Sequence, residues 1–195
     1  MAETSFGPFL KPSSLKRGFS LAETRFQPNR LKFEKFKVWN EWLGRSTSKE
    51  TIDSLAKKFA QLVIDNVVIS PFVGGSQSAI NSANDNSLSF IATGTPDDEI
   101  NLILDRLGLT HYFREVHGSS RKKVIIVKDI LERFHLSPAE VLFIGDAQTD
   151  YQAALDNKID FYLRETDYNS QWFSGKTRIR YKKKDLKFLN EIIDK

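Results

Sequence analysis

Hydrophobic residues recur at three- and four-residue intervals over the first third of the chain. The intervals define two sets of residues, which the polar stretch 46–48 separates. The first set contains Phe33, Phe36, Trp39, Trp42 and Leu43, and the second contains Ile52, Leu55, Phe59, Leu62 and Val63. This spacing places apolar side chains on one face of a helix. The pattern therefore predicts two amphipathic helices, the second capped at its N-terminus by a serine or threonine of residues 46–48.

Beyond Pro71, short apolar runs alternate with helical patterns. Strands are predicted at residues 88–93, around Val116, at 141–144 and at 161–163, and helices at 97–107, 123–134 and 150–157. Such alternation is typical of βαβ units with a parallel sheet. We therefore expect an α/β fold with a parallel, Rossmann-like sheet that binds ligands at the carboxyl ends of its strands.

Several boundaries carry more local signals. Thr95 or Asp97 is the expected N-cap of the helix over 97–107, and Gly108 its C-terminal end. Residues 81–87 read as a polar loop. The tail is expected to end as a surface helix with four apolar residues inward, namely Leu186, Leu189, Ile192 and Ile193.

Composition narrows the class of protein. The 195 residues are 40% hydrophobic and 28% charged, with no cysteine, so a globular protein without disulfides or thiol chemistry is expected. No apolar run reaches the roughly 20 residues of a membrane helix, and we expect a cytoplasmic protein. The net charge of +4 is concentrated in residues 121–123 and 178–184. Because base-stacking aromatic patterns are missing, a solvated basic face or a phosphate-attracting surface is favoured over nucleic-acid binding.

The most informative motif is residues 141–150, Val-Leu-Phe-Ile-Gly-Asp-Ala-Gln-Thr-Asp. Its apolar run predicts a strand buried on both faces, and Gly145 permits a tight turn or close ligand approach. Asp146 would then lie at the carboxyl edge of the sheet, where Mg²⁺ takes oxygen ligands, with Asp150 one helical turn later. The alternative is that the two carboxylates only cap a helix.

Two further segments follow predicted strands. Thr93 and Gly94 end the strand over 88–93, where a hydroxyl and backbone N–H groups could accept an anion, although Thr93 and Thr95 could equally be a strand end and a cap. Residues 121–123 place three cations before a helix, which opposes the helix dipole. A lysine there could hold a phosphate, or the run could be solvated.

Taken together, these segments resemble the haloacid dehalogenase (HAD) superfamily over residues 30–165, in particular its phosphatase-like members with a helical cap, such as phosphoglycolate phosphatase and β-phosphoglucomutase. The resemblance makes Thr93 and Gly94 the phosphoryl-binding segment, and Lys123 the phosphate-binding lysine with Lys122 as the other register. It makes Asp146 and Asp150 the Mg²⁺ site and implies a small phosphorylated metabolite as substrate. Residues 1–68 would be an N-terminal segment and cap, and 69–195 the core with a C-terminal helix. Trp39, Trp42 and Lys35 could line a cap pocket, but core packing is expected of both tryptophans.

The chain departs from that family in one respect. Family members begin with a strand ending in Asp-x-Asp, which supplies the nucleophile, and no such pair occurs here. We therefore expect a truncated, inactive phosphohydrolase, or alternatively a non-catalytic relative that binds a phosphorylated ligand or a protein. Without the first core strand, two neighbouring strands would expose unpaired edges and favour self-association.

Overall fold

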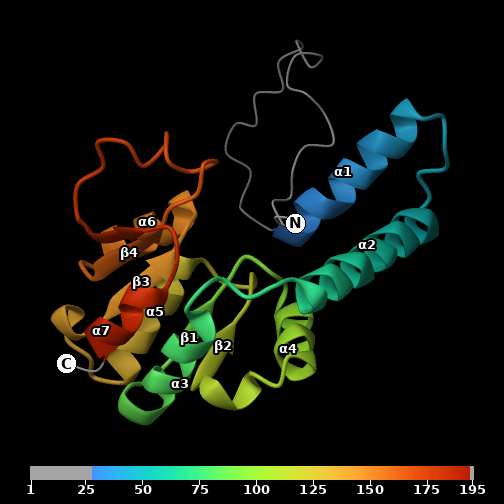
Figure 1. Cartoon of the computed structure of the whole chain (residues 1–195). Helices are drawn as coiled ribbons and strands as arrows, with labels where there is room; N and C mark the ends of the chain where they lie inside the picture. The colour runs from blue at the N-terminus through green and yellow to red at the C-terminus, as the bar shows by residue number, and fades with distance from the viewer. Residues whose placement is uncertain (1–27, 194–195) are drawn as a thin grey trace.

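The computed structural model describes residues 28–193, so the N-terminal segment, residues 1–27, lies outside the described residues. Figure 1 shows a helical hairpin that extends from an α/β body. The α-helices are α1 (Pro28–Trp42), α2 (Lys49–Ile69), α3 (Ser76–Asn86), α4 (Asp97–Arg106), α5 (Lys123–Arg133), α6 (Gln148–Asp156) and α7 (Asn190–Ile193). The strands are β1 (Phe90–Ala92), β2 (Glu115–His117), β3 (Leu142–Gly145), β4 (Asp160–Arg164) and β5 (Ile179–Lys183).

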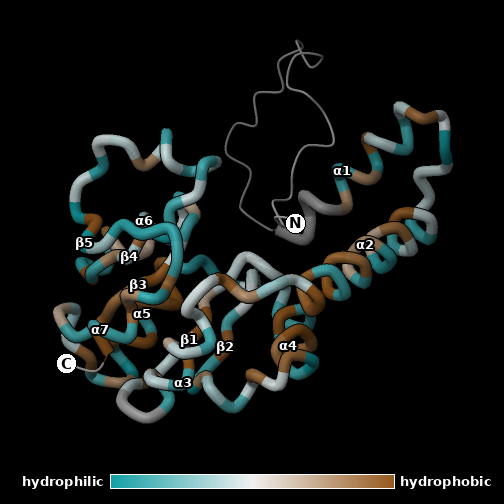
Figure 2. Tube along the Cα trace, viewed as in Figure 1, coloured by the Kyte–Doolittle hydropathy of each residue, from teal (hydrophilic) through white to brown (hydrophobic). Residues whose placement is uncertain are grey.

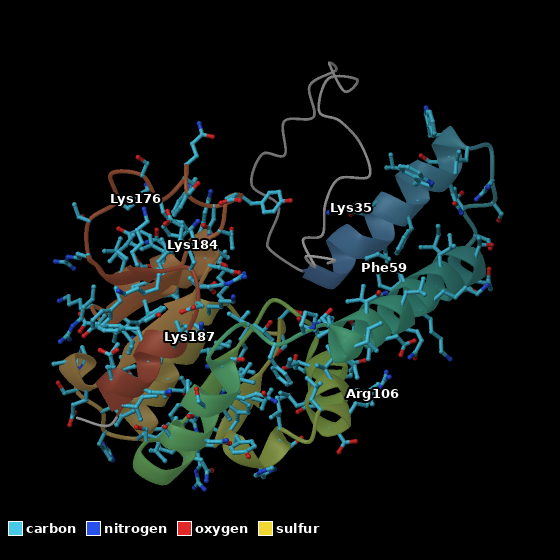
Figure 3. All side chains as sticks on the ribbon, viewed as in Figure 1. Lys35, Phe59, Arg106, Lys176, Lys184 and Lys187 are labelled. Carbon is cyan, nitrogen blue, oxygen red and sulfur yellow. The ribbon has the colours of Figure 1, made fainter. Side chains whose placement is uncertain are left out.

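The hairpin confirms the two amphipathic helices. The Ser48 hydroxyl accepts a hydrogen bond from the Thr51 N–H and caps α2, and an edge-to-face contact of Phe36 with Phe59 joins α1 to α2. The hairpin is anchored to the body where Arg106 of α4 donates to Asp65 of α2 at 2.6 Å (Figure 3). Figure 2 shows hydrophobic residues on α2 and α4 where these helices approach each other.

The tryptophans of α1 do not pack in a core as expected. Trp39 is 43% exposed and Trp42 is 77% exposed, and their rings lie 6.0 Å apart. The reason is that α1 contacts only α2 closely among the described elements, so a single helix face is covered. The expectation of core packing was wrong for both side chains.

The strands are all parallel but form two separate sheets among the described residues. One sheet pairs β1 with β2, and the other has the order β3-β4-β5. Helix α5 contacts both β1 and α6, so it bridges the two sheets. Within residues 28–193, β1 and β3 each pair along one edge only. The predicted α/β fold with parallel strands is confirmed.

Burial is deepest at β4, the central strand of the larger sheet. Phe161, Tyr162 and Leu163 are at most 1% exposed, because neighbouring strands cover both edges and helices cover both faces. Tyr151 and Phe173 pack against Phe161 on one face, whereas Ala79 and Leu189 pack near Tyr162 on the other. This core fixes the positions from which the loops at the strand ends project.

Two elements differ from the sequence-based expectation. Residues 81–87 were expected to be a polar loop, but all except Ser87 belong to α3, which is stabilised by packing against α7. The basic run 178–184 contains β5, in which Ile179 and Tyr181 are partly buried while Arg180 is exposed. The apolar side chains predicted to point inward from the tail do so, since Leu189 is buried and the other three pack on the same cluster, but the helix itself is only four residues long.

A carboxylate of β2 gives the fold a specific acid sensitivity. Glu115 accepts hydrogen bonds from Arg133 of α5 and from His117, and the Arg133 guanidinium lowers the pKa of Glu115 to about 2 from 4.5. A carboxylate with a lowered folded-state pKa stabilises the fold above its unfolded pKa, and this stability is lost as the pH falls through the folded value.

Glu115→Gln is therefore expected to reduce the free energy of unfolding by about 1 kcal/mol at neutral pH. The difference from wild type should shrink as the pH falls from 4.5 towards 2. Urea denaturation across this range measures it, with Glu132→Gln, an exposed carboxylate of α5, as the control. A destabilisation that does not change with pH would contradict the assignment.

Candidate functional site

The loops that follow β1 and β2 are bound to each other. Asp97, the first residue of α4, accepts hydrogen bonds from the N–H groups of Gly118 at 2.7 Å and Ser120 at 3.3 Å, and Ser119 N–H donates to the Thr95 carbonyl. Burial of Asp97 opposes its ionisation, but these hydrogen bonds outweigh that effect and lower its pKa. The loop that contains Thr93 is thereby held against the loop that leads into α5.

This arrangement corrects the predicted cap of α4. The N-cap residue is Pro96, without a side-chain hydrogen bond. The Thr95 hydroxyl instead contacts the Thr93 hydroxyl at 3.3 Å, and the Asp97 carboxylate is used by the next loop. Both expected caps were wrong, because the Thr95 hydroxyl contacts Thr93 and distant N–H groups occupy the Asp97 carboxylate.

Thr93 and Gly94 lie directly after β1, at its carboxyl end. The Thr93 N–H donates to the His117 carbonyl, and the Thr93 hydroxyl accepts from the Thr95 N–H at 3.2 Å. Gly94 is exposed, and a Cβ added there would meet no atom within 4 Å. The segment thus presents a hydroxyl and an open backbone turn, which suits the approach of an anion.

Lys123 and Asp150 form the central contact of the candidate site. The Lys123 ammonium donates to Asp150 Oδ1 at 2.5 Å, and the two side chains are 17% and 7% exposed. Asp150 Oδ2 accepts from the N–H groups of Asp146 and Ala147, as a carboxylate in the first turn of a helix does. The contact therefore joins the start of α5 to the first turn of α6, and through the Asp146 N–H to the end of β3. The Asp150 carboxylate also offsets the positive charge of Lys123 at the N-terminus of α5.

The two lysine registers differ clearly. Lys122 is exposed and is the N-cap residue of α5 without a side-chain cap, whereas the Lys123 side chain points inward to Asp150. Arg121, which precedes α5, forms an ion pair with Asp129 of that helix. The three cations therefore do different things, and Lys123 is the one placed at the strand ends.

Gly145 is required by this packing. A Cβ at Gly145 would lie 2.5 Å from both Cβ and Oδ2 of Asp150, which is closer than van der Waals contact allows. The absence of a side chain at Gly145 lets the Asp150 carboxylate fold over the end of β3.

Asp146 is the accessible carboxylate. Its side chain is 54% exposed and lies 3.7 Å from the Arg164 guanidinium, and its carbonyl accepts from the Asn169 side chain at 2.9 Å. Arg164 Nε is buried without a hydrogen-bond partner among the described residues. Sequence reasoning missed Arg164 and Asn169 and the role of Asp97 between the loops, because their partners lie 18 to 23 residues away along the chain.

Of the predicted metal ligands, only Asp146 presents an exposed carboxylate to a Mg²⁺ ion. Both oxygens of Asp150 accept hydrogen bonds. Asp150 therefore positions Lys123 and the loop after β3, which is close to the alternative prediction that this carboxylate caps a helix. Across residues 28–193, no three His, Cys, Asp or Glu side chains gather as a metal-ligand set. Asp146 alone suits a site in which Mg²⁺ keeps several waters and shares a phosphate.

The geometry brings together some of the predicted residues. Lys123, Asp150 and the Asp146 backbone are in direct contact, and the docked loops connect the Thr93 segment to the start of α5. Thr93 forms no hydrogen bond with Lys123 or Asp146 in the part of the chain that the structure describes. The arrangement offers a hydroxyl, a cation and a carboxylate at the ends of parallel strands.

The fold and these residues define an α/β protein with parallel strands and polar side chains at the strand ends. Comparison with known families gives its class, since the family model described as haloacid dehalogenase-like hydrolase matches residues 29–163. The chain therefore belongs to the haloacid dehalogenase-like hydrolases. No curated protein sequence matches it significantly.

Solved structures share the fold at low sequence identity. A putative HAD-hydrolase, YfnB from Bacillus subtilis, bound to magnesium, has a TM-score of 0.70 at 16% identity, over 87% of this chain and 74% of that one. A putative β-phosphoglucomutase from Thermotoga maritima has a TM-score of 0.67 at 17% identity, over 87% and 83%. A predicted phosphoglycolate phosphatase from Haemophilus somnus has a TM-score of 0.66 at 16% identity, over 82% and 75%.

Among the described residues, no helix combines the length and apolarity that crossing a membrane requires.

Proposed function

We propose that this chain binds a small phosphorylated metabolite at the loops that follow β1, β2 and β3, as a phosphomonoesterase-type member of its family. The observation that carries the proposal is the Lys123–Asp150 contact. It holds an ammonium group near the end of β3, where the same Asp150 carboxylate accepts from the Asp146 N–H and where ligands of such sheets bind. The proposed ligand class also follows the names of two similar structures, a phosphoglycolate phosphatase and a β-phosphoglucomutase.

In the proposed complex, each residue has a separate role. The Lys123 ammonium neutralises charge on the phosphate oxygens, and the Thr93 hydroxyl with the Gly94 N–H donates to them. Asp146 would supply one carboxylate to a Mg²⁺ ion, which would neutralise further charge when bound. Asp150 positions Lys123 by hydrogen bonding and keeps its ammonium directed to the strand ends.

We further propose that the chain as given binds phosphate without measurable turnover. Its 195 residues contain no Asp-x-Asp pair, and loss of a nucleophile typically lowers the rate by several orders of magnitude. The alternative role, a non-catalytic protein that binds a phosphorylated ligand or a protein, uses the same site. A cytoplasmic location and self-association through the free edges of β1 and β3 also remain proposals.

Calorimetric titration with inorganic phosphate in the presence of Mg²⁺ tests the site. Thr93→Val, which removes one hydroxyl at nearly constant volume, is expected to weaken phosphate binding about tenfold, or about 1.4 kcal/mol. Thr110→Val, at an exposed threonine, is the matched control and should bind like wild type. Asp146→Asn should remove the Mg²⁺ dependence of binding.

Two outcomes would count against the proposal. Absence of saturable phosphate binding to the wild-type chain would reject the binding site. Hydrolysis of p-nitrophenyl phosphate that disappears in Asp146→Asn would instead show that the chain is an active phosphatase. That result would reject the proposed absence of turnover and leave the proposed binding site standing.

A further inference from the structure

A cavity lies at the opposite end of the larger sheet from the candidate site. It has a volume of about 440 Å³ and lies at the amino ends of β4 and β5, where Asp160 and Ile179 begin these strands. The candidate site, in contrast, follows the carboxyl end of β3. The volume falls within the range of small-molecule pockets, about 300–1,000 Å³.

The floor of this cavity is apolar and rigid. Its six apolar side chains are Tyr151, Ala154, Leu155, Ile159, Phe161 and Ile179. Four of them are at most 7% exposed, and the Tyr151 hydroxyl donates to the Thr177 carbonyl at 2.8 Å. The other two, Leu155 and Ile179, are partly exposed, so a small apolar group in the cavity would contact these two side chains.

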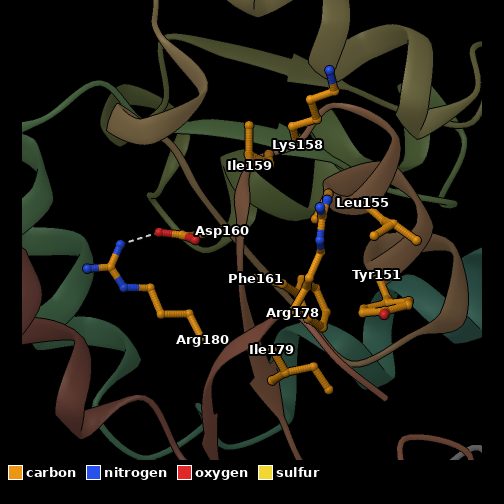
Figure 4. Close-up of a pocket in the computed structure, with 10 residues that line it drawn as sticks. Tyr151, Leu155, Lys158, Ile159, Asp160, Phe161, Arg178, Ile179 and Arg180 are labelled. Carbon is orange, nitrogen blue, oxygen red and sulfur yellow. Dashed lines mark hydrogen bonds and ion pairs between the residues drawn. The ribbon is translucent and has the colours of Figure 1, made fainter.

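The rim carries an excess of positive charge. Of its four charged residues, Arg180 and Asp160 form an ion pair with each other, which Figure 4 marks with a dashed line. The side chains of Lys158 and Arg178 are exposed and form no ion pair or hydrogen bond with any residue between 28 and 193. Figure 4 draws Arg178 with Leu155 and Ile179 among the residues that line the cavity.

Both unpaired cations also occupy an unfavourable backbone conformation. Lys158 has a φ of 59° and Arg178 a φ of 62°, a region where glycine or asparagine is favoured over long side chains. Lys158 is the residue after the C-cap of α6, where a left-handed conformation is common and a cation is favoured. Arg178 directly precedes β5, and the two cations lie on one cavity rim.

We propose that this cavity binds an organic anion with a small apolar body and a single acidic group. The body would contact Leu155 and Ile179, and the acidic group would accept hydrogen bonds from Arg178 and Lys158. Carboxylate and phosphate monoester ligands share this chemistry. The inference is independent of phosphate binding at the strand carboxyl ends.

Titration of the full chain with 2-naphthoate, followed by calorimetry, tests the cavity. One saturable site is expected, and Arg178→Gln should weaken the affinity about tenfold, equal to about 1.4 kcal/mol. Arg45→Gln, which removes one exposed cation from the α1–α2 connection, should leave it unchanged. Neutral 2-naphthamide should bind the wild type at least about tenfold more weakly, because it lacks the charge. A thermal melt of each variant checks folding.

Two more measurements show which acidic group the cavity accepts and whether the ligand binds there and not at the Thr93 loop. Phenylphosphonate in place of 2-naphthoate shows whether a phosphorus acid is accepted equally, and either preference is consistent with an anion site. Thr93→Val should bind 2-naphthoate like wild type. Equal affinity of Arg178→Gln and wild type, no binding at all, or a loss in Thr93→Val as large as that in Arg178→Gln would overturn the proposal.

Discussion

Replacing Asp150 with alanine is expected to lower the free energy of unfolding by about 3–5 kcal/mol. The substitution leaves the Lys123 ammonium, only 17% exposed, without its partner, and it removes the acceptor for the N–H groups of Asp146 and Ala147. An unpaired buried charge and two uncapped donors all destabilise the folded state. Urea denaturation followed by circular dichroism gives the difference directly.

Two controls make this result specific. Asp146→Asn changes a half-exposed carboxylate of the same loop and should alter stability by no more than about 0.5 kcal/mol. Asp150→Ala combined with Lys123→Met removes both charges and should recover most of the loss, because a matched apolar pair leaves no buried charge unpaired. Equal destabilisation by Asp150→Ala and Asp146→Asn would show that the Lys123 contact contributes little.

Replacing Gly118 with alanine is expected to lower the free energy of unfolding by about 3 kcal/mol, at the upper end for overpacking. The new Cβ would lie 2.5 Å from Asp97 N and 2.7 Å from the Thr95 carbonyl oxygen. These are backbone atoms, so the two loops must separate rather than a side chain rotate. The hydrogen bonds from Gly118 and Ser120 to Asp97 would be lost with that separation.

Gly94→Ala is the matched control, because its Cβ would point into open space. It should leave stability within about 0.5 kcal/mol of wild type. Phosphate affinity provides a second measurement, since Gly118→Ala shifts the Thr93 loop relative to α5 and should weaken binding. A Gly118→Ala variant as stable as Gly94→Ala would show that the loops are not packed as described.

The positions of the two docked loops also explain why the candidate site could be anticipated only in part. Thr93 and Asp146 could be selected from sequence because each follows an apolar run that predicts a strand. Lys123 could be selected because it begins a predicted helix. Which atoms they contact could not, because Lys123 and Asp150 are 27 residues apart. The Asp150 oxygens accept hydrogen bonds from Lys123 and from the N–H groups of Asp146 and Ala147, and a place for Asp150 in a Mg²⁺ site stays a prediction.

The sequence by itself determined the parts of the fold that local periodicity controls. The intervals of Phe36 and Phe59 with their neighbours predicted α1 and α2, and the apolar run before Gly145 predicted β3, since helix and strand periodicity is set by residues a few positions apart. The expected burial of β3 on both faces was wrong, because Ile144 is 42% exposed. The tertiary structure alone decided β5 and α3. Their polar sequences favour neither state, and pairing with β4 or packing against α7 supplies the missing stabilisation. The tertiary structure also decided that the strands form two sheets and that Lys158 and Arg178, without ion-pair partners among the described residues, lie on the rim of one cavity. Both features depend on contacts between distant segments.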